Sequence, residues 1–306
     1  MIVPPELIKT RPRLRLPQCS LVMLEDGRTA YGDDMSAENL IFDIGMHQGE
    51  DTDFYLKKGF RVIGVEANPV LSEYCIQRFQ NACQTGQLVV VSKAVVEHGG
   101  GTVDFYVNKR FSIWGTADRD WMVRNQKLGA ESDVIQVPSV RTDDLLSQYG
   151  IPYYMKVDIE GLDHVCISTL VSQTDKPSYV SVETHAYSYA ETLKLLTLLS
   201  AAGYTRFKIV SQTGVANQIC PHPAREGAYV DARFPAHASG LFAKELPGSW
   251  LTLAEAKSQF RRIYRIIRFL GPHYGVLRKF KNHYTIAALA RRFPAADDWF
   301  DIHACL

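Results

Sequence analysis

A glycine-rich junction between an apolar run and a helical stretch constrains the fold of this chain more than any other feature. The run Leu40–Ile44 leads into Asp43-Ile-Gly-Met-His-Gln-Gly49, and residues 50–59 have helical character. A short apolar run that ends in glycine is typical of a buried parallel strand. Glycines here let a ligand approach the backbone, and the following helix offers free N–H groups. The junction is therefore a candidate binding site.

The same alternation of strand and helix continues along the chain. Further strands are predicted over residues 61–66, 88–91, 153–157 and 179–182, and helices over residues 69–83, 142–149, 161–171 and 188–201. This order indicates βαβ units, and hence an α/β fold with a mostly parallel sheet and helices on both faces. Residues 206–210 and 240–243 are expected to supply the last two strands.

The chain divides into three predicted regions. Residues 1–38 form an N-terminal lead-in with a short strand expected over residues 20–24, residues 39–250 form the α/β domain, and residues 251–306 form a C-terminal helical extension. Residues 251–292 carry ten Lys or Arg and one acid, for a charge of +9, against −8 for the rest of the chain.

The extension has several interpretations. It can pack on the domain with a solvated basic face, make peripheral contact with an anionic membrane surface, or bind an acidic acceptor. It can also bind the acidic body of a second subunit, which would give a homodimer.

The spacing of the glycines indicates the kind of ligand. Nicotinamide enzymes carry Gly-x-Gly-x-x-Gly, which places a pyrophosphate on the helix end. Asp43-x-Gly-x-x-x-Gly49 lacks the first close glycine pair and suits a ligand without a pyrophosphate, although such glycines also serve packing. Glu66 ends the next strand, 17 residues after Gly49. An acid at that place can accept hydrogen bonds from both hydroxyls of a ribose, so we expect an adenosyl ligand.

Carboxylates also follow two later strands. Lys156-Val-Asp-Ile-Glu-Gly161 places Asp158 and Glu160 after one strand, and Glu183 and His185 follow the next. In a parallel sheet these strand ends meet at one edge. Such a group can position a hydroxyl, remove its proton or hold a divalent cation. A loop histidine without a role, and an acid that only caps the following helix, are the alternatives for His185 and Glu160.

Four stretches of the chain together resemble the FkbM family of methyltransferases. They are Phe42-Asp-Ile-Gly-Met-His-Gln-Gly49, Val65-Glu-Ala-Asn-Pro69, Val137-Pro-Ser-Val-Arg-Thr-Asp-Asp-Leu145 and Met155-Lys-Val-Asp-Ile-Glu-Gly161. The resemblance covers about residues 40–210. It implies a Rossmann-like class I methyltransferase fold, bound S-adenosylmethionine, and in most cases O-methylation of sugars or natural products.

The resemblance also implies roles for individual residues. Those around the methionine part of the cofactor would be Asp43, Gly45, Met46 and Gly49, although the family often has Ala-Asn where this chain has Met46-His47. Glu66 would hold the ribose. The adenine would lie between Ala67 and Asn68 on one strand end and Ala94 and Val95 on another, and Asp158 would lie near the transferred methyl group.

We therefore predict an S-adenosylmethionine-dependent methyltransferase that acts by direct displacement on a hydroxyl of a small-molecule or glycan acceptor. Either His185 or Asp158 would take the hydroxyl proton. A divalent cation such as Mg²⁺, held by Asp158, Glu160 or Glu183, could instead lower the pKa of the hydroxyl.

Other activities remain as alternatives. The acceptor could be a protein side chain, or the chain could be an inactive cofactor-binding partner subunit. Nucleic acid suits the basic tail, but nucleobase methyltransferases usually carry Asn or Asp followed by Pro-Pro and an aromatic residue, where this chain has Asp158-Ile-Glu-Gly161. The six cysteines are scattered, which argues against a zinc cluster or a disulfide framework. No apolar run reaches membrane-spanning length and no secretory signal is visible, so a cytoplasmic protein is expected.

Overall fold

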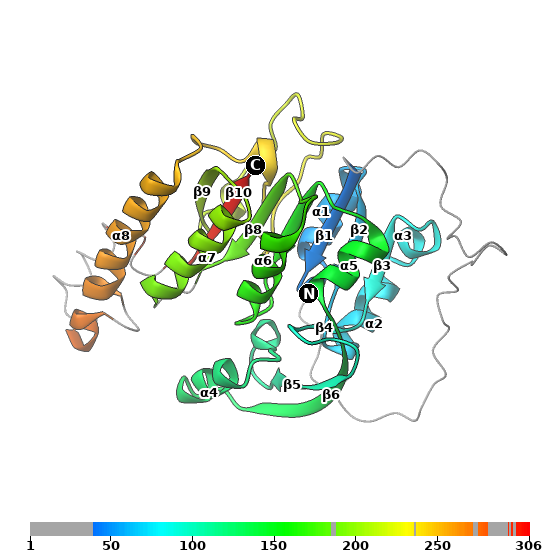
Figure 1. Cartoon of the computed structure of the whole chain (residues 1–306), viewed down its shortest axis with the longest axis horizontal. Helices are drawn as coiled ribbons and strands as arrows, with labels where there is room; N and C mark the ends of the chain where they lie inside the picture. Colours follow the sequence, from blue (N-terminus) through cyan, green and yellow to red (C-terminus); the bar gives the residue numbers. More distant parts are fainter. Residues whose placement is uncertain are drawn as a thin grey trace. The chain divides into compact units, whose positions relative to one another are not determined.

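The central element of the fold is a seven-stranded sheet (Figure 1). The computed structural model describes residues 39–184, 188–235, 237–271, 275–280, 293, 295 and 298–306. The chain divides into Met1–Met35 and Ser36–Leu306, and all described residues belong to the second unit. The expected lead-in and its short strand lie outside the described residues.

The sheet has the order β3-β2-β1-β7-β8-β10-β9. All neighbours are parallel except β10, which runs antiparallel to both β8 and β9. The strands are β1 (Leu40–Ile44), β2 (Arg61–Val65), β3 (Leu88–Val91), β7 (Tyr154–Val157), β8 (Tyr179–Glu183), β9 (Arg206–Ser211) and β10 (Phe300–Cys305). The predicted α/β class and mostly parallel sheet are confirmed.

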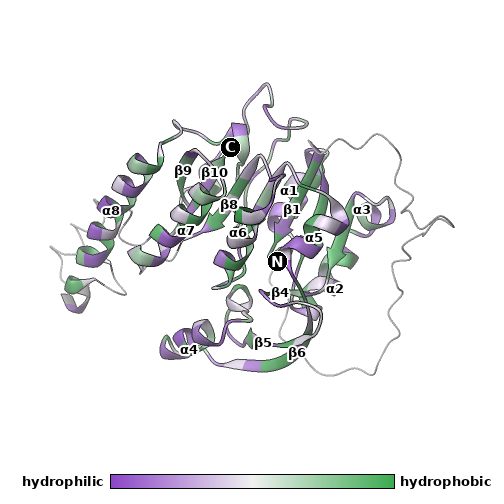
Figure 2. Cartoon of the chain, viewed as in Figure 1, coloured by the Kyte–Doolittle hydropathy of each residue, from purple (hydrophilic) through white to green (hydrophobic). Residues whose placement is uncertain are grey.

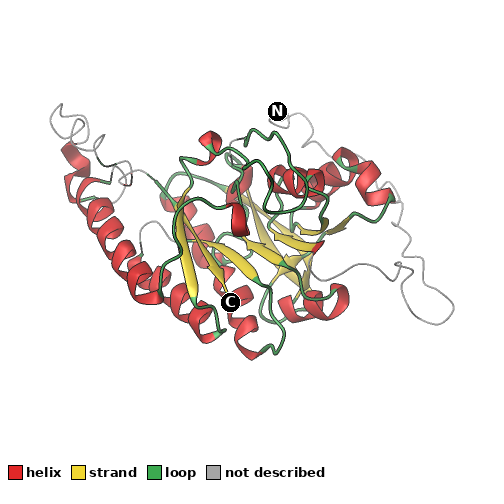
Figure 3. Cartoon of the chain, turned by 90° about the horizontal axis from the view of Figure 1, so that it is seen from above, coloured by secondary structure: helices red, strands yellow, loops and turns green. Residues whose placement is uncertain are grey.

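Each face of the sheet is covered by its own apolar core. On one face, Phe42 and Met155 pack with side chains of α5 (Thr142–Tyr149), α6 (Asp163–Ser172), α7 (Tyr189–Ala201) and α8 (Leu253–Leu270). On the other face, Ile41 and Tyr154 pack with α1 (Glu50–Lys57), α2 (Pro69–Arg78) and the segment 215–246. Figure 3 shows helices on both sides of the strands. Burial on both faces explains why most of the strands are nearly continuous apolar runs.

A smaller three-stranded sheet, in the order β4-β6-β5, lies beyond β3 in the chain. It consists of β4 (Ala94–Val95), β5 (Thr102–Asn108) and β6 (Ser132–Val140). The segment between β5 and β6 contains the 3₁₀ turn η3 (Ser112–Trp114) and α4 (Arg119–Lys127).

Two predicted elements are wrong: one helix is broken and one strand is absent from the described structure. The helix predicted over residues 69–83 breaks at Phe79, whose φ of −111° and ψ of 32° are not helical, and continues as α3 (Gln80–Gln84). Residues 240–243 form no strand. The backbone turns at Gly240, with φ of +84°, and again at Ala243, with φ of +49°. Leu241 and Phe242 are buried in the core on the α1 face rather than paired in the sheet.

The last strand comes instead from residues 300–305, which insert between β8 and β9. The extension predicted as helical over residues 251–306 therefore ends in the sheet itself. Its first part is a helix as expected: α8 begins at a capping box formed by Thr252 and Glu255 and buries Phe260, Ile263 and Ile267. Its arginines at positions 261, 262, 265 and 268 are exposed, and Figure 2 shows hydrophilic stretches along this helix. None of the described helices is long and apolar enough to span a bilayer.

Candidate functional site

The turn between β1 and α1 depends on both glycines of the motif. Gly45 has φ of +88° and Gly49 has φ of +79°, a region that favours glycine. A Cβ atom on Gly45 would lie 1.8 Å from the backbone oxygen of Asp158, and one on Gly49 would lie 2.4 Å from the Phe79 ring. The N–H groups of Gly45 and Met46 donate to the carbonyl of Val65 at 2.9 and 3.0 Å. The turn is thus held tightly against the ends of β2 and β7.

Glu66 follows β2, beside this turn. Its carboxylate accepts hydrogen bonds from the backbone N–H of His47 at 2.9 Å and of Asn68 at 2.8 Å. His47 is fixed in turn, with Nδ1 3.1 Å from Glu50 and Nε2 2.9 Å from the hydroxyl of Ser112. Burial raises the pKa of Glu66 to about 7. Two backbone turns therefore orient one buried acid.

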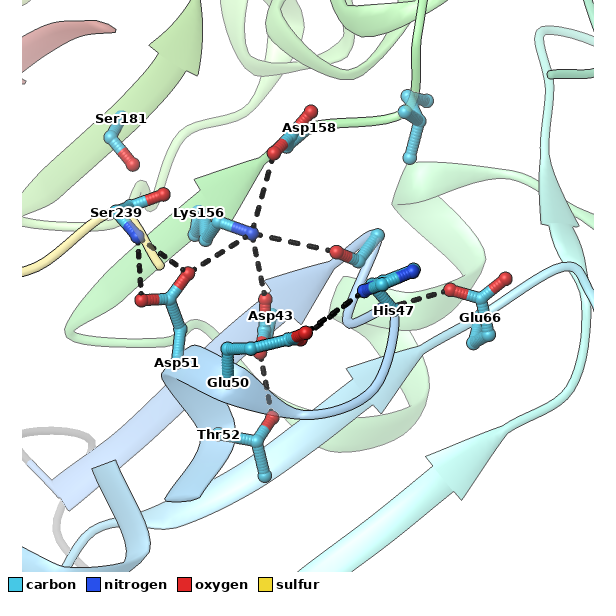
Figure 4. Close-up of polar contacts among 12 residues, drawn as sticks. Asp43, His47, Glu50, Asp51, Thr52, Glu66, Lys156, Asp158, Ser181 and Ser239 are labelled. Atoms are coloured by element: carbon cyan, nitrogen blue, oxygen red, sulfur yellow. Dashed lines mark hydrogen bonds and ion pairs between the residues drawn. The ribbon is translucent and has the colours of Figure 1, made fainter. Parts of the chain in front are cut away.

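Lys156 is the centre of a network of acids behind the turn (Figure 4). Its Nζ atom lies 3.5 Å from Asp43, 3.3 Å from Asp51 and 3.6 Å from Asp158, and it donates to the carbonyl of Gly45 at 3.4 Å. Burial opposes the lysine's charge, but the three carboxylates outweigh it and raise the pKa of Lys156 well above its ordinary value. One cation therefore holds together the ends of β1 and β7 and the start of α1.

The two acids deepest in this network have further partners. Asp43 accepts a hydrogen bond from the Thr52 hydroxyl at 2.6 Å. Asp51 accepts the backbone N–H of Ser239 at 2.8 and 3.1 Å, which anchors the segment 237–246 to α1. Burial raises the pKa of both carboxyls, that of Asp51 to about 6. The network therefore holds this segment against the sheet.

Four acids gather where β7, β8 and β10 reach the same edge of the sheet, and we call them the acid cluster: Asp158, Glu160, Glu183 and Asp301. Oxygens of the first three lie within 4.8 Å of one another. Asp301 is the register partner of Glu183 on the neighbouring antiparallel strand. Burial, with repulsion from Asp158, raises the pKa of Glu160 to about 8 and the pKa values of Glu183 and Asp301 well above their ordinary range.

The indole N–H of Trp121, on α4, donates to the Glu160 carboxylate at 2.6 Å. Glu160 also has a φ of +55°, and its carbonyl accepts a hydrogen bond from the Thr116 hydroxyl at 2.7 Å. The segment between β5 and β6 thus fixes Glu160 in a backbone conformation that a non-glycine residue rarely adopts. This placement goes beyond a simple cap of the next helix.

A cavity of about 560 Å³ joins the glycine turn to the acid cluster. Most residues predicted for the site line it: Gly45, Met46, Glu66, Ala67, Asn68, Ala94, Val95, Asp158, Glu160 and Glu183. Asp43 and Gly49 do not, because Asp43 faces Lys156 and Thr52 while Gly49 packs on Phe79. His185 lies outside the described residues.

The remaining walls come from segments between regular elements. Ser112, Ile113 and Trp114 of η3 lie on one side, and Thr213, Pro235 and Ser239 contribute elsewhere. The segments 108–132 and 211–238 therefore both contribute to the cavity. Trp299 and Asp301 complete the lining from the end of the chain, which the sequence did not suggest.

Three important residues escaped the sequence prediction: Asp51, Lys156 and Asp301. Asp51 resembles an ordinary acid in the first turn of a helix. Lys156 carried the one available signal, since a lysine inside an apolar strand needs a buried partner. Asp301 belongs to a strand that was expected to be helical extension.

Comparisons with known proteins find one family model and several solved structures that are similar to this chain. The methyltransferase FkbM domain matches residues 43–206, more than half of the 306 residues. A solved S-adenosylmethionine-dependent methyltransferase from Archaeoglobus fulgidus is 14% identical, with 88% of this chain and 86% of that chain covered and a TM-score of 0.35.

A second solved structure, a precorrin-6Y C5,15-methyltransferase from Geobacter metallireducens, is 10% identical over 57% of this chain and 68% of that chain, with a TM-score of 0.32. A third, a putative sarcosine dimethylglycine methyltransferase from Galdieria sulphuraria, is 7% identical over 87% and 77%, with a TM-score of 0.35. No curated protein matches the sequence significantly.

Proposed function

Because the chain belongs to the FkbM family of methyltransferases, we propose that it transfers the methyl group of S-adenosylmethionine to a hydroxyl of a sugar or natural product. One observation carries this proposal. A single cavity contains the glycine turn and Glu66 at one end and the acid cluster at the other. A cofactor and an acceptor can therefore meet beside Asp158.

The residues present fit this cofactor. Glu66 presents a fixed carboxylate to the cavity, which suits the two hydroxyls of a ribose. Ala67, Ala94 and Val95 provide apolar walls that suit an adenine ring. The Gly45 carbonyl suits the cofactor's ammonium group. When bound, the cofactor supplies an electrophilic methyl group on a positively charged sulfur.

The chain's own contribution is orientation and proton transfer. Asp51 and Asp158 of the Lys156 network both line the cavity, but the side chain of Asp158 is 37% exposed and that of Asp51 only 2%. We propose that the carboxylate of Asp158 accepts the proton of the acceptor hydroxyl, and that Lys156 positions this carboxylate. His185 is the alternative base.

A divalent cation is the second way to activate the hydroxyl. Asp158, Glu160 and Glu183 each offer one oxygen within 4.8 Å of the others. In that case turnover would be lost with a chelator and restored by Mg²⁺. Turnover that persists in excess EDTA would assign the step to the carboxylates alone.

The decisive experiment is calorimetric titration of the purified protein with S-adenosylhomocysteine. Glu66→Ala should abolish binding, while Glu131→Ala, at a surface side chain that is 84% exposed, should leave it unchanged. Failure of the folded wild-type protein to bind would contradict the proposal at its base.

A further inference from the structure

With all four carboxyls ionised, the acid cluster would hold more negative charge than its surroundings balance. Lys156 pairs with Asp158, Asp43 and Asp51, so its single charge is shared among three carboxylates. Glu160 receives a neutral indole N–H from Trp121, and Arg124 on the same helix acts on it electrostatically. Lys156 also acts electrostatically on Asp301, but among the described residues it makes no ion pair with Asp301 or Glu183.

Asp301 and Glu183 are the two acids of the cluster whose carboxyl groups have no partner among the described residues. Asp301 is 6% exposed and lines the cavity. Its carboxylate makes no hydrogen bond or ion pair with any residue in the described part of the chain, and the same holds for Glu183. Burying a carboxyl group without a partner costs free energy, and most buried polar groups in proteins have a hydrogen-bond partner. An unpaired acid that opens into a substrate cavity is consistent with a partner that arrives with the substrate.

We propose that the acceptor carries a protonated amine next to the hydroxyl that is methylated, and that Glu160, Glu183 and Asp301 bind this ammonium group. The acceptor class is then an amino sugar or another amine-bearing natural product. The inference rests on the proposed methyl transfer and specifies its substrate.

The geometry of the cluster suits an ammonium group. A tetrahedral ammonium that donates to three carboxylates at about 2.8 Å holds their oxygens about 4.6 Å apart. The oxygens of Glu160 and Glu183 lie within 4.8 Å of each other, and Asp301 is the register partner of Glu183 on the adjacent strand. Trp114 and Trp299 add apolar surface to the same cavity, which suits the face of a sugar ring.

The same contacts explain how the enzyme would choose oxygen over nitrogen. Neighbouring carboxylates favour the charged form of an amine. A protonated amine has no lone pair and cannot accept the methyl group. The new C–O bond therefore forms at the hydroxyl as the bond from methyl to sulfur breaks, and the hydroxyl proton passes to Asp158. The products are a methyl ether and S-adenosylhomocysteine.

The test compares two sugars that differ in charge, on protein saturated with S-adenosylhomocysteine. Glucosamine is cationic, and N-acetylglucosamine is its neutral counterpart. Calorimetry should show glucosamine binding at least about tenfold more tightly, the size expected for a hydrogen bond to a charged group. Glu183→Gln and Asp301→Asn should each weaken glucosamine binding without changing N-acetylglucosamine binding. Glu131→Gln should change neither.

Three results of the binding experiments would overturn the proposal: equal binding of the two sugars, no binding of glucosamine, or Mg²⁺ binding to the cluster that excludes glucosamine. Titration of every variant with S-adenosylhomocysteine reports whether the cofactor end is intact. Absence of S-adenosylhomocysteine binding by the wild-type protein would instead refute the proposed function. In turnover assays with an amino sugar, mass spectrometry should place the methyl group on oxygen, and an N-methyl product would also overturn the proposal.

Discussion

The ammonium of Lys156 lies 3.6 Å from the carboxylate of Asp158, two residues further along the same strand end. Both residues line the cavity, but the lysine side chain is 6% exposed and that of Asp158 is 37% exposed. This pair therefore connects a structural network, built on Asp43 and Asp51, to the acid that we place next to the reacting hydroxyl. Stability and catalysis should be separable by changing one partner at a time.

Lys156→Met should be strongly destabilising. The substitution leaves Asp43 and Asp51 buried without their cation, which costs about 3–5 kcal/mol for a buried pair that loses one partner. The free energy of unfolding from chemical denaturation measures this. Lys57→Met removes an exposed lysine on α1 and should change it by less than about 0.5 kcal/mol. Equal values for the two variants would show that the network contributes nothing.

Asp158→Asn should separate turnover from cofactor binding. Loss of a positioned proton acceptor lowers the rate by about 10²–10⁴-fold. Affinity for S-adenosylhomocysteine should change little, because Glu66 and the glycine turn are untouched. Formation of S-adenosylhomocysteine measures the rate, with Glu131→Gln as the control. Unchanged turnover would remove Asp158 from the reaction.

Gly45→Ala should abolish cofactor binding as well as destabilise the fold. The new Cβ atom would meet the backbone oxygen of Asp158 at 1.8 Å, so β7 and the turn would have to separate. Gly100→Ala is the matched control, because Gly100 has a φ of +95° but no atom within 4 Å of the new Cβ. That variant should cost about 1–2 kcal/mol from backbone strain alone. Similar behaviour of the two would mean that the close approach at Gly45 is unimportant.

Glu66 should make the stability of the ligand-free protein depend on pH. Burial raises its pKa from 4.5 to about 7, so the folded protein holds a proton that the unfolded chain has released. Its contribution is fully present below pH 4.5 and is lost as the pH rises through 7. Between these values, the free energy of unfolding should fall by up to about 1.4 kcal/mol per pH unit from this group.

This effect is isolated by comparing how steeply the free energy of unfolding changes with pH in the two proteins, not by comparing its absolute value. Denaturation of wild-type protein and Glu66→Gln at pH 5.5, 6 and 6.5 should give a steeper decline for the wild type. Parallel slopes would show that Glu66 does not change its protonation on folding in this window.

We expect the exposed arginines of α8 to contribute to binding of anionic membrane surfaces and not to turnover. Replacing Arg261, Arg265 and Arg268 by Glu should reduce sedimentation with phosphatidylserine vesicles, most clearly at low salt. Activity on a soluble acceptor should be unchanged. If the wild type does not sediment with these vesicles, the basic face is only solvated surface, as its packing on the sheet already allows.

The sequence predicted the cofactor half of the sheet well, because its signals are local. The run Leu40–Ile44 is buried on both faces of the sheet, and the positive φ angles at Gly45 and Gly49 favour glycine. The sequence pattern and the structure therefore agree here. The positions of Glu66 and Asp158 followed from a geometric rule, since parallel strands end at one edge. Asp43 was misjudged for a related reason. It is the register partner of Lys156 and faces that residue, not the cavity.

The part of the sheet formed by β8 and β10, where we propose that the acceptor binds, was less predictable, because its contacts are distant in the chain. In β10, Asp301 and His303 alternate with Ile302 and Ala304, a pattern typical of a half-exposed strand, although both polar residues are buried. The strand also follows a strongly basic helix. Asp51 meets Lys156 across more than 100 positions, and no periodicity in the sequence encodes that pairing.

The position of β10 also has a consequence for biosynthesis. β8 and β9 do not pair with each other, and each of them has β10 as a neighbour. Residues 212–299 must be translated after β9 before β10 exists, so both strands leave the ribosome with an open edge. Open edges can pair with other chains. Translation order thus makes the half of the sheet that carries Asp301 the last to close, and the edges of β8 and β9 stay open to association during that interval.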